Sequence, residues 1–175
     1  MQKRLLLFLL LPFVVIACEE DLINVSFNYD FDSSFKAPIH QNVSEDLIIE
    51  SEEFDLEVAR ELDERNLASM TAVKLESVQL DIPADEDINW DAVKSLQLSM
   101  IIDGISSPLA SLPEGHGNLT KSLNLQIDAG EVQLMQFLDK ETAQLKLVAE
   151  MNEALSTEIE VGIKVNVKIT AVPAN

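Results

Sequence analysis

The segment from residue 157 to residue 171 constrains the fold most, because it alternates apolar and polar side chains more regularly than any other stretch. Every second residue from Ile159 to Ile169 is isoleucine or valine, and mostly polar residues such as Glu160 and Lys164 stand between them. A period of two places these sets on opposite faces of a β-strand. The chain must therefore bury one face of a long strand against a second layer of structure.

Similar alternation, less regular, predicts several further strands. In the first of them Ile23, Val25, Phe27, Tyr29 and Phe31 fall on one side. The dipeptide Asp103-Gly104 predicts a tight hairpin turn, and the short connection 152–156 predicts that the last two strands pair as an antiparallel hairpin. The expected strands are 22–31, 35–39, 43–50, 73–82, 94–103, 121–129, 145–151 and 157–171.

Two segments have helical rather than strand spacing. Residues 55–68 place Leu56, Ala59 and Leu62 on one stripe, and Glu61 and Arg65 are one turn apart, as in a stabilising ion pair. Residues 131–140 also have an apolar stripe at helical spacing. Both segments are predicted to be short helices. Residues 83–91 are predicted to form an acidic loop, and residues 107–118, with two prolines and two glycines, a second loop.

These elements predict a mainly β protein, an antiparallel β-sandwich with two short helices. A small up-and-down β-barrel is the alternative, because strand lengths and spacing do not separate the two. The 175 residues, 47% of them hydrophobic, suffice for the core of one domain. Only 5% are aromatic, so this core is expected to be mainly aliphatic.

The formal net charge is −19, and it is concentrated in the first half of the chain. From Glu19 to Asp91 there are 21 acids and only four basic residues. Such a surface repels phosphate backbones and anionic lipid headgroups, which argues against nucleic acid and against a polybasic membrane contact. The acids form either a solvated face or a docking face for a basic partner or divalent cations.

The N-terminus has the organisation of an export signal. Two basic residues, Lys3 and Arg4, precede 13 almost continuously apolar residues, 5–17. At ~1.5 Å per residue this run is about 20 Å long as a helix, too short for a ~30 Å hydrocarbon core. It fits the apolar region of a signal peptide, predicted to span residues 1–17. An ordinary secretory leader with a chance cysteine is the alternative.

The run ends Val15-Ile16-Ala17-Cys18, which resembles the lipobox of bacterial lipoproteins. The resemblance implies cleavage between Ala17 and Cys18, diacylglycerol on the Cys18 sulfur, and an acyl group on the new N-terminus. Several acyl chains would give a stable membrane anchor. Cys18 is the only cysteine, so no intramolecular disulfide competes for it.

An acidic cluster, Glu19-Glu20-Asp21, follows the cysteine. It resembles the export signal of surface lipoproteins from Bacteroidetes-type bacteria. Residues 18–21 would then be an acidic lipidated tether, and residues 22–175 a single domain. The resemblance implies a location in the cell envelope, at the outer membrane, on its periplasmic or its cell-surface face.

Recognisable catalytic sets are missing from the sequence. His40 and His116 are far apart, no second cysteine could help to bind zinc, and neither a nucleophile elbow nor a phosphate loop occurs. We therefore expect no enzymatic activity and no cofactor besides the covalent lipid.

A candidate calcium loop is the exception, because four oxygen-bearing residues alternate in a short stretch, as at the start of an EF-hand loop. Trp90 stands where that loop needs glycine, and Leu96 where it needs glutamate. The alternative is an acidic connection with Trp90 tucked beneath it. The candidate ligands are Asp85, Asp87, Asn89 and Asp91.

Taken together, the chain resembles uncharacterised small envelope lipoproteins of Bacteroidetes-type bacteria. The expected role is that of a non-enzymatic, lipid-anchored structural or protein-interaction module with an envelope protein as partner. The alternative is a module that binds a small apolar or cationic molecule. Such a module needs an internal pocket, for example one lined by Met100, Leu125 and Phe137.

Overall fold

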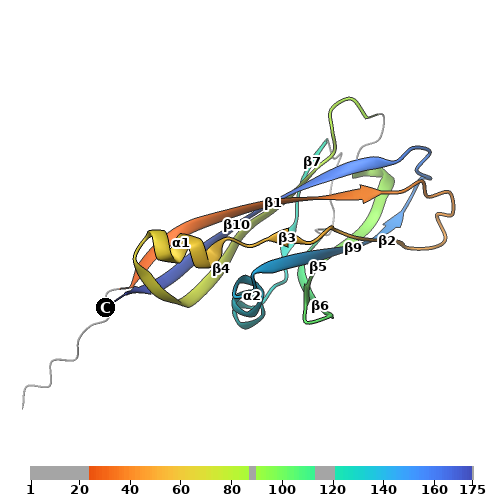
Figure 1. Ribbon diagram of the computed structural model, residues 1–175. Helices are drawn as coiled ribbons and strands as arrows, with labels where there is room; N and C mark the ends of the chain where they lie inside the picture. Colours follow the sequence, from red (N-terminus) through yellow and green to blue (C-terminus); the bar gives the residue numbers. More distant parts are fainter. Residues whose placement is uncertain (1–23, 87–89, 113–120, 175) are drawn as a thin grey trace, which may run out of the picture.

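The computed structural model describes residues 24–86, 90–112 and 121–174, and these form two antiparallel sheets packed face to face (Figure 1). The sheets do not close into a barrel, so the β-sandwich prediction is confirmed. The order in sheet 1 is β1 (Val25–Ala37), β10 (Ile159–Pro173), β4 (Leu67–Asp81) and β7 (Ser122–Asn124). The order in sheet 2 is β2 (Leu47–Glu50), β9 (Thr142–Met151), β5 (Val93–Ile102), β6 (Ile105–Ser111) and β8 (Gln126–Ile127), with β3 (Phe54–Asp55) also beside β9.

The core lies between the sheets and is built from alternate residues of the inner strands. In β10 every second residue from Ile159 to Ala171 is buried, as the sequence pattern predicts. In β9 the buried set is equally regular, from Ala143 to Met151. Each strand thus turns one apolar face towards the opposite sheet, the arrangement that a period of two requires.

The predicted hairpin between the last two strands is wrong. β10 pairs with β1 and β4, whereas β9 pairs with β2, β3 and β5, so the two strands belong to different sheets. The connection between them crosses the sandwich: Leu155 is buried, and its backbone exchanges two hydrogen bonds with His40. β10 instead finds a longer partner in β1, which matches it over 13 residues.

Further boundaries differ from the prediction, and the predicted strand 121–129 is two short strands, β7 and β8, in different sheets. The segments 22–31 and 35–39 are one strand, because Asp32, Ser33 and Ser34 continue the pairing with β10. Residues 107–111, predicted as a loop, belong to β6, which accommodates Pro108 next to a bulge at Leu109: Ser99 pairs with Pro108 and Leu98 with Ala110. Bulges are where a sheet tolerates proline.

The hairpin turn at Asp103-Gly104 is confirmed. Ile102 pairs with Ile105, so only these two residues connect β5 to β6. Their φ angles are 50° and 79°, in the left-handed region that two-residue turns of this kind need. Glycine adopts this region without steric cost, and aspartate tolerates it better than most residues.

Both predicted helices are present and short. α1 (Val58–Glu64) is followed by Asn66, whose φ of 57° is left-handed and ends the helix before β4 begins. α2 (Glu131–Leu138) buries Leu134, Phe137 and Leu138. η1 (Trp90–Ala92) is a single 3₁₀ turn before β5. Within the described residues, no helix is long and apolar enough to cross a membrane.

The helices cover one end of sheet 1. In Figure 1, α1 lies at the end of the sandwich where the C-terminus lies, and both helices contact β4. The first residue of β1, Val25, pairs with Ala171 near the end of β10. The chain therefore enters and leaves the domain at this end, which also carries the two helices.

Candidate functional site

The residues of the predicted anchor lie outside the described residues. They are Val15, Ile16, Ala17, Cys18, Glu19, Glu20 and Asp21. The described chain begins at Asn24, directly before β1. Lipidation and cleavage at Cys18 therefore remain predictions from the sequence.

The calcium candidates are only partly described. Asp87 and Asn89 lie outside the described residues, while Asp85 is exposed and the Asp91 carbonyl accepts a hydrogen bond from Asn152. Among described residues, no three histidine, cysteine, aspartate or glutamate side chains gather closely enough to hold a metal. Calcium binding stays a prediction.

Trp90, beside these candidates, is a core residue. Its side chain is only 3% exposed, and its indole Nε1 donates a hydrogen bond to the Lys121 carbonyl at 3.0 Å. A buried indole usually satisfies its N–H in this way. The tucked tryptophan that the sequence suggested as the alternative to a calcium loop is thus present.

The other residues singled out in the sequence do not form a common site. His40 Nε2 lies 3.0 Å from the Glu45 carbonyl oxygen, and His116 lies outside the described residues. Met100, Leu125 and Phe137 are all buried in the core. A cavity between the sheets, of about 30 Å³, lies elsewhere in the core and holds about one water molecule's volume. Its lining includes Ile82, Trp90, Leu147, Leu155 and Val161.

Asp81 organises a polar cluster on sheet 1. Its carboxylate accepts hydrogen bonds from Ser122 at 2.6 Å, Gln79 at 2.8 Å and Lys164 at 2.9 Å, and so connects β4, β7 and β10. Burial alone would raise the pKa of Asp81, but these donors outweigh it and hold the pKa below the ordinary value. These three partners are strand residues, so the cluster stabilises the pairing of neighbouring strands.

A groove follows the outer edge of β1, and we call it the edge groove. β1 is the terminal strand of sheet 1, and no described strand pairs with its free side. Two adjoining hollows of about 440 Å³ and 660 Å³ line this side, and they share Asp32. Residues 28–36 of β1 form one wall together with Glu160 of β10, and parts of segment 50–65 form the other.

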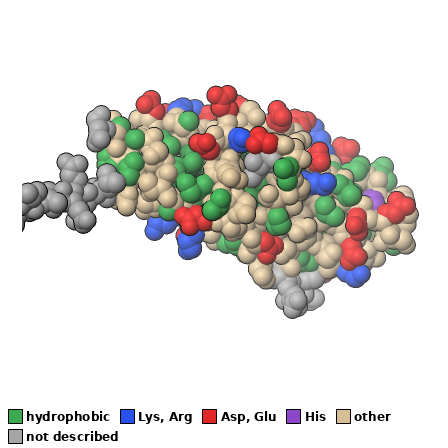
Figure 2. Space-filling view, turned by 90° about the horizontal axis from the view of Figure 1, so that it is seen from below, with side chains coloured by type: hydrophobic (Ala, Val, Ile, Leu, Met, Phe, Trp, Pro, Cys, Tyr) green, Lys and Arg blue, Asp and Glu red, His purple; other side chains and the backbone are tan. Residues whose placement is uncertain are grey.

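The edge groove is strongly acidic. The basic residues that line it are Lys36 and Arg65, and Arg65 is engaged by Glu61 at 3.1 Å and lies over the Phe27 ring. This Glu61–Arg65 contact is the ion pair that the helical spacing predicted. Figure 2 shows acidic side chains along the whole length of the visible face, more numerous than basic ones. The groove acids are Asp30, Asp32, Glu50, Glu52, Glu53, Asp55, Glu57, Glu61 and Glu160.

Aromatic residues hold the two walls of the edge groove together. The Phe31 ring of β1 stacks on Phe54 at 5.7 Å between centroids. The Tyr29 hydroxyl accepts a hydrogen bond from the Glu57 backbone N–H at 3.1 Å, and burial raises the pKa of this tyrosine. The groove is therefore a fixed feature of the fold, built on packed side chains.

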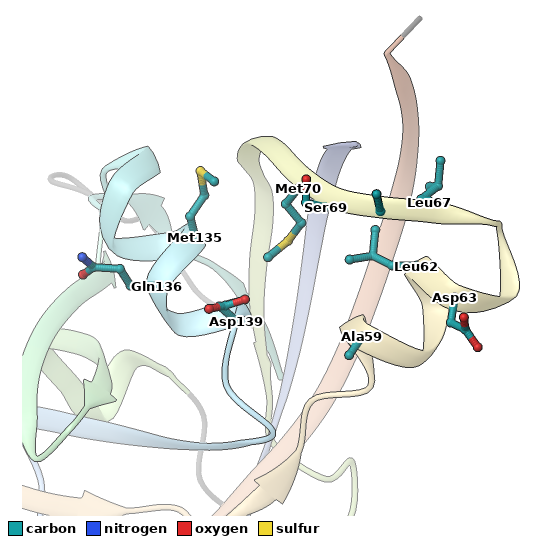
Figure 3. Close-up of a pocket in the computed structure, with 10 residues that line it drawn as sticks. Ala59, Leu62, Asp63, Leu67, Ser69, Met70, Met135, Gln136 and Asp139 are labelled. Atoms are coloured by element: carbon teal, nitrogen blue, oxygen red, sulfur yellow. The ribbon is translucent and has the colours of Figure 1, made fainter. Parts of the chain in front are cut away.

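A second groove is apolar and lies between α1, the first residues of β4 and α2 (Figure 3). Its volume is about 590 Å³, and Met70 of β4 lies between Leu62 of α1 and Met135 of α2. The polar residues in its lining are Asp63, Ser69, Gln136 and Asp139. Methionine side chains adapt to ligands of different shapes. We call this the helix groove.

Neither groove was found from the sequence. The acidic excess of the first half was visible, but its gathering along one strand edge depends on pairing between distant segments. In the helix groove, Leu62 and Met135 were predicted to belong to helix stripes that pack on the core. The structure confirms that both pack against the core, but it leaves them half-buried, and they line the groove between α1 and α2.

The fold and these grooves define the chain as a two-sheet antiparallel β-sandwich with an acidic strand edge. No family model matches the chain, and no curated protein matches it. Among solved structures, a chain from Desmodium yellow mottle tymovirus is similar, with 12% identity, coverage of 86% of this chain and 89% of that one, and a TM-score of 0.29.

Proposed function

We propose that this protein is a bacterial envelope lipoprotein, anchored to the outer membrane by lipid on Cys18, that acts through protein interaction rather than catalysis. The lipobox-like Val15–Cys18 sequence carries the proposal. The position of the domain's entry point supports it. β1 begins at Val25, seven residues after Cys18, so the anchor would attach directly to the end of the sandwich that carries the helices.

This geometry leaves the edge groove free of the membrane. Residues 19–24 would span at most about 20 Å at 3.3–3.6 Å per residue, which keeps the domain close to the bilayer. β1 runs away from that end, so its free edge would extend away from the membrane surface. Its acids would also be repelled by anionic headgroups, which favours contact with proteins over contact with lipid.

Replacement of Cys18 tests the anchor. Wild-type protein grown with labelled palmitate is expected to incorporate label and to sediment with membranes, whereas Cys18→Ala incorporates none and loses the anchor. The size of the product must be measured, because an uncleaved leader could hold the variant on membranes. Absence of label from the mature wild-type protein would refute the proposal.

A second candidate function is binding of a small apolar molecule, and the helix groove favours it. Leu62, Leu67, Met70 and Met135 give the groove an apolar lining of the kind that ligand sites have. Its position at the entry end of the sandwich would also bring it near a membrane surface, where apolar molecules are concentrated.

A charged residue in the helix groove tests that candidate. Met70→Asp is expected to weaken the binding of an apolar fluorescent probe such as a naphthalene dye at least about tenfold, because a carboxylate would have to lose water on contact. Val132→Asp on the exposed side of α2, where Val132 is 65% exposed, is the matched control. Equal probe binding by both variants and by the wild type would place the probe elsewhere.

A further inference from the structure

We infer that the free edge of β1 is a docking site for an extended, basic polypeptide segment, which would add to sheet 1 as a further strand. The inference rests on the proposed interaction role and names its partner class and its place on the molecule. It depends on two independent features, an unpaired strand edge and the charge of the groove beside it.

The unpaired edge points to a strand as the ligand. β1 is a regular 13-residue strand that pairs with β10 throughout, and alternate backbone groups must face the opposite side. In the described part of the chain no other strand forms hydrogen bonds with these backbone groups. The backbone hydrogen bonds of the described turns, loops and helix caps also involve none of residues 25–37. Proteins commonly bind extended peptides by adding them to such an edge.

The groove is long enough for such a strand. The grooved stretch covers residues 28–36, which is about 30 Å at ~3.4 Å per residue. The opposite wall is separate backbone, from β2 and β3 to α1, and the Tyr29–Glu57 hydrogen bond fixes it in place. An added strand would therefore lie along the outer side of β1, next to this fixed segment.

The charge identifies the partner as basic. Nine acids and two basic residues line the groove, and Asp30 and Asp32 stand on the same face of β1. Lysine or arginine at alternate positions of an added strand would lie beside these two carboxylates. Opposite charges across neighbouring strands stabilise the pairing, and complementary potentials raise the association rate.

The same charge argues against a second copy of this chain as the occupant. Antiparallel pairing of two β1 strands about Phe31 would place Asp30 of one copy opposite Asp32 of the other, twice. Like charges at directly opposed positions destabilise a sheet. The aspartates thus protect the edge from self-association while leaving it open to a basic strand.

The test uses the mature full-length protein in a neutral detergent and a labelled ten-residue peptide that alternates lysine with threonine or valine. We expect saturable binding that weakens as salt increases. Hydrogen–deuterium exchange should show new protection in residues 25–37. A peptide in which proline replaces each threonine and valine keeps the charge but cannot pair as a strand, so it should not bind.

Two matched double variants locate the site. Asp30→Asn with Asp32→Asn removes two charges from the groove and is expected to weaken binding about tenfold at low salt, the combined effect of losing two exposed ion pairs. Glu76→Gln with Asp103→Asn removes two charges outside the groove and should change binding little. The Asp30→Asn change keeps a side-chain oxygen, so the hydrogen bond that Asn166 donates to Asp30 can still form.

Several results would overturn the inference. Equal binding of the proline peptide would show a diffuse electrostatic attraction, and protection confined to another segment would place the site elsewhere. Dimers that disappear when β1 is altered would make a second copy the occupant. Calcium binding at the groove acids without peptide binding would assign them to cations. Because lipid incorporation is measured separately, failure of the anchor and failure of the docking site are distinguishable.

Discussion

Phe137→Ala is expected to lower the free energy of unfolding by about 3–5 kcal/mol, because it removes a large, fully buried side chain from the core. Phe137 is fully buried, and its ring lies 6.1 Å from that of Phe31 in β1. The side chain therefore ties α2 to both the core and the strand that carries the edge groove. A domain of this size has a total stability of about 5–15 kcal/mol, so the loss is severe.

Denaturant unfolding followed by circular dichroism measures this effect. Val132→Ala is the control on the same helix, because Val132 is 65% exposed and its truncation should cost less than about 0.5 kcal/mol. If Phe137→Ala unfolded at the same denaturant concentration as the wild type, α2 would not be packed into the core as described.

Sequence patterns predicted the layers of the fold because burial in a sandwich is local and periodic. β10 and β9 each bury one face without interruption, so their alternation is clear in the sequence. The weaker pattern of residues 73–82 has a structural cause. In β4 both Leu75 and Val78 are buried, because a register shift opposite Asn166 and Val167 turns the strand between them.

Strand partners could not be predicted in the same way, because pairing is a competition between distant segments. The short connection after β9 favoured a hairpin, but β10 aligns with all of β1, more than 120 residues earlier in the chain. One signal against a hairpin was present in the sequence: the connection contains the apolar Leu155, which a simple surface turn would leave exposed. The structure buries this side chain.

The edge groove lay beyond the sequence for the same reason. Its acids come from β1, from segment 50–61 and from Glu160 of β10, and only the pairing of β1 at the edge of sheet 1 gathers them. The sequence did show an acidic first half and raised a basic partner as one explanation. The structure adds the location, a strand edge with a wall on its far side.

The predicted anchor differs from the edge groove, because it can be predicted from the sequence alone. The prediction rests on the resemblance of the linear sequence Val15–Cys18 to a lipobox, which needs no folded context. The described domain, which begins at Asn24, neither adds to that recognition nor alters it. Anchor and domain are therefore tested by separate experiments.

Trp90→Ala is expected to cost about 3–5 kcal/mol as well, and it also bears on the calcium candidates. The indole fills the core beside the 30 Å³ cavity and donates to the Lys121 carbonyl. Its loss would enlarge that cavity and remove this donor. Unfolding must be followed by circular dichroism, because Trp90 is the only tryptophan and its emission is lost in the variant.

Trp90→Phe separates packing from hydrogen bonding. Phenylalanine keeps most of the apolar volume but has no N–H. The Lys121 carbonyl keeps a second donor, the Ile82 N–H at 2.8 Å, so the expected cost is about 0.5–1.5 kcal/mol, that of one neutral hydrogen bond. A cost equal to that of alanine would mean that the hydrogen bond to Lys121 dominates. A cost near zero would mean that water replaces the indole N–H.

A calcium titration distinguishes the calcium loop from the alternative, an acidic connection beside a buried Trp90. If Trp90 is held by the core alone, millimolar calcium and a chelator should leave the melting temperatures of wild type and Trp90→Phe unchanged. If Asp85, Asp87, Asn89 and Asp91 bind the ion, calcium must raise the melting temperature of the wild type, because a ligand that binds only the folded state stabilises it. If the melting temperature does not shift, calcium binding by these four residues is rejected. The alternative, an acidic connection beside a buried Trp90, then stands.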